Sequence, residues 1–141
     1  MTKNLEYKIG VVEINKDNFD KEGDEAHKFL VYRNEKVILI YILGSFNHAR
    51  ITEKFGLKHK GVLGGGRIYL SKSGSLIFEG KSFLYGSVPR EVAEKFGTLI
   101  KDEIKKEGIE AKEVLVQTED RFAHSFWEKI GFLDSEEAKN F

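Results

Sequence analysis

Seven consecutive apolar residues, VILIYIL at positions 37–43, constrain the fold of this chain more than any other feature. β-Branched and aromatic residues dominate the run, which favours a strand. Because even and odd positions are both apolar, neither face of the strand suits solvent, and such strands lie inside a sheet that is covered on both sides. The run Lys36–Leu43 therefore predicts an interior strand with helices on both faces of its sheet.

Further strands are predicted around this one. The run Lys28–Arg33 precedes it, and Asn34-Glu35 between the two runs suits a tight hairpin turn. Residues Glu6–Ile14 are rich in Val and Ile, and the acidic stretch that follows them reads as a loop. In LGGGRIYLSKSGSLIFEGKS we expect a glycine loop and then a second hairpin, because apolar and polar positions alternate (Ile68, Leu70, Leu76 and Phe78). EVLVQ at 113–117 completes the predicted strands.

Two helices are predicted from apolar spacing and capping residues. A short helix is capped by Ser45 or Asn47 and stopped by Gly56, with a buried pair four residues apart (Ile51 and Phe55). The clearest helix has Pro89 in its first turn, Gly108 past its end and one apolar stripe (Val88, Val92, Phe96, Leu99, Ile100 and Ile104).

The C-terminal part is predicted to form a third helix and a polar tail. Thr118 caps this helix and Gly131 stops it, with apolar residues on one face (Phe122, Phe126 and Ile130). No internal repeat and no linker rich in Pro or Ser divides the chain. We therefore expect one α+β domain over residues 1–141, with a central mixed, mostly antiparallel sheet and helices on both faces.

Charge and composition exclude several classes of function. The 23 basic and 23 acidic residues balance, so no sequence-wide positive field can hold nucleic acid or an anionic membrane. Cysteine is absent and the four histidines are scattered, which excludes disulfides, zinc ribbons and a cysteine nucleophile. The N-terminus lacks the apolar core of a signal peptide. We expect a soluble cytoplasmic protein without metal, other cofactors, nucleic-acid partners or membrane attachment.

Two glycine-containing segments are candidate anion sites. Three glycines and a cation at Gly64–Arg67 leave backbone N–H groups uncovered beside a guanidinium, a combination that can hold a phosphate. The alternative is a glycine bulge at the start of a strand. In GKSFLYG, the Ser82 hydroxyl and backbone N–H groups near a helix N-terminus can serve an oxyanion. The alternative is a connecting loop with Tyr85 packed on the core.

His48 is a candidate general base, because it is predicted in the first turn of its helix. The positive end of the helix dipole disfavours imidazolium, and a neutral imidazole can accept a proton. A surface or capping role is the more common fate of a lone histidine. That plainer role is the one expected for His27, His59 and His124.

In their order and spacing, these segments resemble the protein histidine phosphatase family, also called Janus/Ocnus. The matching stretches are KFLVYR, FNHARITEKFG, GVLGGGRI, GKSFLYG and EVLVQTEDRF, within residues 28–122. LGGGRI together with GKSFLYG is much more specific than either motif alone. Residues 123–141 form a C-terminal helical extension beyond the resemblance.

The resemblance implies a metal-independent phosphatase that hydrolyses phosphohistidine or phospholysine, on a phosphorylated protein or a small phosphoramidate. It makes His48 the catalytic base. The implied phosphoryl-binding residues are Lys28, Gly65, Gly66, Arg67, Ser82 and, through its backbone N–H, Leu84. These residues suit the chemistry, because a phosphoramidate has a weak P–N bond, and the protein must chiefly hold the phosphoryl oxygens and orient a water.

Two other functions stay open. KKEGIEAKEVLVQTED followed by RFAHSFWEKIGF resembles the last third of the GNAT-type acetyltransferases, which use acetyl-coenzyme A. Their pyrophosphate loop is missing from YGSVPREVAEKFG, so we interpret Phe126, Trp127, Ile130 and Phe132 as core residues. A non-catalytic phosphoprotein-binding module is the third possibility, because it uses the same anion site without a working base.

Overall fold

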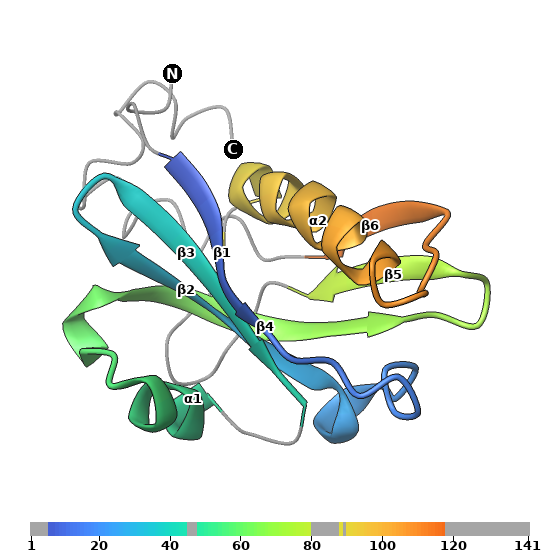
Figure 1. Cartoon of the computed structure of the whole chain (residues 1–141), viewed down its shortest axis with the longest axis horizontal. Helices are drawn as coiled ribbons and strands as arrows, with labels where there is room; N and C mark the ends of the chain where they lie inside the picture. Colours follow the sequence, from blue (N-terminus) through green and yellow to red (C-terminus); the bar gives the residue numbers. More distant parts are fainter. Residues whose placement is uncertain (1–5, 45–47, 80–87, 89, 118–141) are drawn as a thin grey trace.

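The computed structural model describes residues 6–44, 48–79, 88 and 90–117, which form one mixed sheet of six strands and two helices (Figure 1). This is the α+β class that the sequence predicts. The strand order is β1-β3-β2-β4-β5-β6. The strands are β1 (Glu6–Val12), β2 (His27–Asn34), β3 (Val37–Leu43), β4 (Val62–Leu70), β5 (Ser75–Glu79) and β6 (Glu113–Gln117), and the helices are α1 (His48–Phe55) and α2 (Arg90–Lys105).

The strand β3 lies between β1 and β2, which confirms the interior position predicted from its apolar run. It pairs parallel with β1 and antiparallel with β2, its hairpin partner. The hairpin turn contains Glu35 in a left-handed conformation with φ 57°. The pairs β2–β4 and β4–β5 are antiparallel, and β5–β6 is parallel, so the sheet is mixed and mostly antiparallel.

The expected glycine loop before β4 is wrong, because the three glycines are part of the strand. Gly64, Gly65 and Gly66 pair with Val31, Leu30 and Phe29 of β2. The register shifts at the start of this pairing, between Val31 and Tyr32. Pairing with a central strand therefore overrides the weak strand propensity of glycine.

Both described helices end close to where the sequence predicts. Gly56, with φ 65°, follows α1, and Gly108, with φ 83°, lies shortly after α2. These left-handed conformations suit glycine at a helix C-terminus. The predicted caps Ser45 and Asn47, the helix residue Pro89 and the C-terminal helix at 118–131 lie outside the described residues.

The two helices belong to different cores. Ile51 of α1 packs in a small cluster with Leu30, whereas Phe96 of α2 lies in the main core with Phe29 and Val31. Successive strand residues point to opposite faces, so these two cores lie on opposite sides of β2. Figure 1 shows a strongly curled sheet, and helix coverage of both faces along its whole width stays a prediction.

The polar stretch after β1 contributes a core residue that the sequence analysis missed. Phe19 is 2% exposed, and its carbonyl accepts a 2.9 Å hydrogen bond from the backbone N–H of Leu70. Its ring packs edge-on against His27, with 5.1 Å between the ring centroids. This single aromatic side chain anchors an otherwise polar loop to the core.

Candidate functional site

Lys28 and Arg67 lie directly opposite each other on β2 and β4, at the centre of the sheet. Directly opposed residues of an antiparallel pair point to the same face, with Cβ atoms about 5 Å apart. Both side chains are half-buried. The structure therefore brings together two predicted phosphoryl-binding residues that are far apart in the sequence.

This pairing concentrates positive charge. Like charges directly opposite each other destabilise a sheet, and partial burial strengthens their repulsion. The Lys28 ammonium donates a 2.6 Å hydrogen bond to the carbonyl oxygen of Ala26, which uses one of its three N–H groups. On the other side of Arg67, Glu79 of β5 is its partner in register. Together with Glu79, the pair forms a row of two cations and one carboxylate across three strands.

The helix α1 packs on the face that carries this pair. Leu43 lies opposite Lys28, and Leu30 follows Lys28 by two residues, so both point to the same side as the lysine. Both leucines pack in one cluster with Ile51 of α1. The helix begins at His48, one turn before Ile51, although the structure describes only the backbone of this histidine. The predicted base thus begins the helix that covers the face of the cation pair.

For the remaining predicted site residues, the structure gives only a backbone position or no description. Gly65 and Gly66 are strand residues in register with β2, and their contact with a phosphate stays a prediction. Ser82 and Leu84 lie outside the described residues. The chain enters that segment from Glu79, the residue paired with Arg67.

Tyr69 lies near two carboxylates, those of Glu79 and Glu22, and the sequence analysis did not identify this group of residues. It follows Arg67 by two residues on β4, so it shares the face of Arg67, and it is 7% exposed. Burial raises the pKa of Tyr69 to about 12, and the nearby carboxylates of Glu79 and Glu22 add to this shift. A hydroxyl beside two carboxylates therefore borders the cation pair. No sequence motif signals it, because the three residues come from separate segments.

His27 is buried, so the surface or capping role expected from the sequence is wrong for this histidine. Its ring is 1% exposed, and Nε2 accepts a 3.0 Å hydrogen bond from the backbone N–H of Asn15. The proton of the neutral ring therefore sits on Nδ1, which has no hydrogen-bond partner among the described residues. Burial, followed by the charge of Lys28, lowers the pKa of His27 to about 4. The side chain of His59 and all of His124 lie outside the described part.

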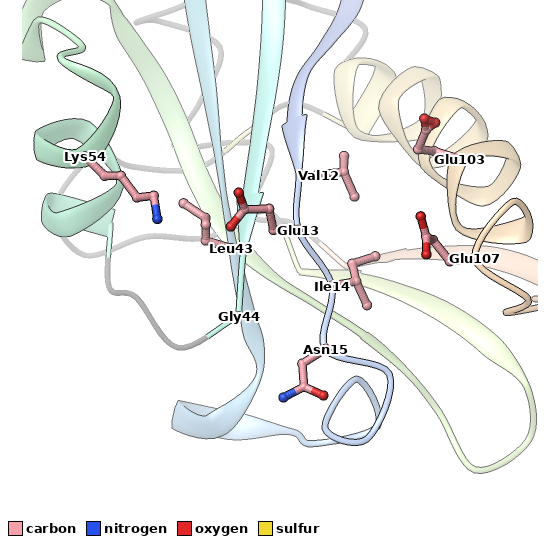
Figure 2. Close-up of a pocket in the computed structure, with 9 residues that line it drawn as sticks. All are labelled: Val12, Glu13, Ile14, Asn15, Leu43, Gly44, Lys54, Glu103 and Glu107. Carbon is pink, nitrogen blue, oxygen red and sulfur yellow. The ribbon is translucent and has the colours of Figure 1, made fainter.

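An open cleft of about 530 Å³ lies at the ends of β1 and β3 (Figure 2). Figure 2 shows Lys54 of α1 on one side, Glu103 of α2 and Glu107 of the turn after α2 on the other, and Glu13 between them. Of the predicted site residues whose side chains the structure describes, none lines it; its described lining consists of Val12, Glu13, Ile14, Asn15, Leu43, Gly44, Lys54, Glu103 and Glu107. Within the described ranges, no group of three or more His, Cys, Asp or Glu residues is arranged to hold a metal ion.

Comparisons with protein-family models, curated proteins and solved structures give no match to this chain. Among the helices that the structure describes, none is long and apolar enough to cross a membrane. The residues on which the acetyltransferase reading depends, Phe126, Trp127, Ile130 and Phe132, lie outside the described part of the chain. Within the described residues, the geometry therefore supports the candidate site around Lys28 and Arg67.

Proposed function

We propose that this chain is a metal-independent phosphatase that hydrolyses the P–N bond of phosphohistidine or phospholysine. The observation that carries the proposal is the direct opposition of Lys28 and Arg67 on the two central strands. Both side chains are half-buried and share one face of the sheet, so both can reach a single anion. A phosphoryl group bound there would be attracted by both, because guanidinium and ammonium groups are strong donors to phosphate oxygens.

The proposed reaction is an in-line displacement at phosphorus. Lys28 and Arg67 hold the phosphoryl oxygens, assisted by backbone N–H groups of Gly65, Gly66 and Leu84 and by the Ser82 hydroxyl. His48 takes one proton from the attacking water, whose oxygen forms the new P–O bond. The P–N bond breaks with its electron pair on nitrogen, which takes a proton from solvent, and His48 later returns its proton to solvent. The products are the free amine or imidazole and hydrogen phosphate.

The positive charge that this reaction needs is supplied by side chains, which is why no metal ion is invoked. Two cations beside the transferring group stabilise the charge on its oxygens, the role that metal ions fill in other phosphoryl-transfer sites. As part of the same proposal we expect a cytoplasmic enzyme acting on a phosphorylated protein or a small phosphoramidate. The formal net charge of zero supports the absence of a nucleic-acid or membrane partner.

Phosphate release from a chemically phosphorylated histidine peptide tests the proposal. The purified full chain should release phosphate, and excess EDTA should leave the rate unchanged. Loss of turnover with EDTA, restored by a divalent ion, would contradict the metal-independent mechanism. Binding of the peptide without turnover would favour the non-catalytic module, and acetyl transfer from acetyl-coenzyme A to a lysine peptide would favour the acetyltransferase.

A further inference from the structure

Glu79 extends the row of charged side chains across the sheet. Lys28, Arg67 and Glu79 lie side by side on the consecutive strands β2, β4 and β5, each in register with the next. Side chains in such a row point to one face, so the carboxylate borders the cation pair on the side of β5. It is also the last described residue before the segment that contains Ser82.

Tyr69 is a neighbour of this carboxylate. Glu79 and Glu22 both lie close enough to Tyr69 to raise the pKa of its hydroxyl. The tyrosine is 7% exposed and keeps its proton at neutral pH, so its single O–H group can serve as a donor to one of the two carboxylates. The strand register therefore places Glu79 beside Arg67, with Tyr69 as a neighbour of its carboxylate.

A carboxylate in this place affects phosphoramidates and phosphate esters in opposite ways. The leaving group of a phosphoramidate must be protonated as the P–N bond breaks, on the amine nitrogen of phospholysine or on the far ring nitrogen of phosphohistidine, because a deprotonated amine or imidazole is a poor leaving group. A nearby negative charge favours that positive nitrogen. The leaving oxygen of a phosphate ester instead gains negative charge, which the same carboxylate opposes.

We infer that Glu79 is a specificity-determining residue that directs the Lys28–Arg67 site to phosphoramidates and against phosphate esters; this inference rests on the proposed function. Lys28 and Arg67 bind the phosphoryl group, which both substrate classes share. Glu79 faces the leaving group, in which the classes differ, and Tyr69 positions its carboxylate.

A purely structural role for Glu79 makes a different prediction. Opposite charges paired across strands contribute to stability, and the Arg67–Glu79 pair has the register for this. In that case, removing the carboxylate charge lowers stability and affects both substrate classes equally. The ratio of the two activities separates this role from leaving-group selection.

The experiment compares Glu79→Gln with the matched control Glu22→Gln, which removes the other carboxylate at Tyr69 without touching the row. For each variant, kcat/KM is measured with a phosphohistidine peptide and with p-nitrophenyl phosphate. Glu79→Gln should lower the ratio of amidate to ester activity by about tenfold to hundredfold, whereas Glu22→Gln should change it by less than about threefold. If Glu79→Gln fails to fold, Tyr69→Phe should shift the ratio in the same direction by a smaller factor.

An unchanged ratio in Glu79→Gln, with the wild-type chain active on the phosphohistidine peptide, overturns the role of Glu79 and leaves the proposed function intact. Equal shifts in Glu79→Gln and Glu22→Gln also overturn it, because the effect would then be general electrostatics. A wild-type chain that hydrolyses neither substrate overturns the proposed function and this inference together.

Discussion

The backbone N–H of Asn15 donates a hydrogen bond to the Nε2 atom of the buried His27 ring. A second proton on that ring would have to occupy Nε2, so protonation removes the acceptor of Asn15 and places a charge in the core. The loop that follows β1 is therefore held by a histidine that must stay neutral.

We predict that this histidine makes stability depend on pH in the acid range. The pKa of His27 falls from 6.5 to about 4 on folding, so the unfolded chain binds more protons between these values. Stability is full above pH 6.5 and is lost progressively as the pH falls to about 4. Urea unfolding at several pH values should show this loss, on the order of 1 to 3 kcal/mol. The control His27→Gln, which keeps an acceptor, should have a smaller slope, and an equal slope in both proteins would contradict the assignment.

The catalytic roles of His48 and Arg67 predict different kinetic defects. His48→Ala should lower kcat by about a hundredfold to ten-thousandfold and leave inhibition by inorganic phosphate nearly unchanged, because a base acts in the transition state. Arg67→Ala should weaken phosphate inhibition as well as turnover. Arg33→Ala, in the other half of β2 from Lys28, is the control and should retain activity. A matching loss of phosphate affinity in His48→Ala would make His48 a phosphate ligand instead.

The packing of α2 on β6 predicts that no larger residue can replace Gly97 without a clash. A Cβ atom at Gly97 would lie 2.5 Å from Cγ1 of Val114, a stiff side chain that cannot swing aside. Gly97→Ala should therefore destabilise the protein by about 1 to 3 kcal/mol, although alanine favours helices. Urea unfolding measures the effect. Adding Val114→Ala should restore part of the loss; a Gly97→Ala protein as stable as the wild type would contradict the close contact.

The hairpin turn predicts a stabilising substitution. Glu35 has φ 57°, a conformation that costs a side-chain-bearing residue roughly 1 to 2 kcal/mol and glycine very little. Glu35→Gly should raise the midpoint of thermal unfolding, because the relief exceeds the added entropy of the unfolded chain. Lys36→Gly, at the neighbouring turn position, should lower it. A lower midpoint for Glu35→Gly would show that the turn is not strained.

Local sequence patterns predicted most of the elements. The strand at 113–117 has the bounds read from EVLVQ, and α2 follows from its apolar stripe. The glycines of β4 could not be assigned, because their strand conformation depends on pairing with β2 and not on their own propensity. Phe19 was missed for a similar reason, since its polar neighbours give no periodicity and its burial is decided by His27 and Leu70.

The sequence predicted which residues belong to the candidate site, but it could not predict how they are arranged in space. Its members were named from motifs, but the opposition of Lys28 and Arg67 depends on strand register, and that register shifts near Val31. A one-residue slip would place the two cations on different faces. The neighbourhood of Tyr69, Glu79 and Glu22 depends on the same pairing, so no single segment of sequence contains it.

The position of the cation pair has a consequence for how the site is assembled. β2 and β3 form one hairpin and β4 and β5 another, and Lys28 and Arg67 meet at the boundary between these two hairpins. Each hairpin closes over a short loop, whereas their docking requires the longer closure through α1. The pair therefore exists only after the hairpins dock, and bound phosphate should slow hydrogen exchange of the amides between β2 and β4 more than of those near the turns. Docking of the two hairpins then determines both the affinity for phosphate and the cooperativity with which the central sheet unfolds.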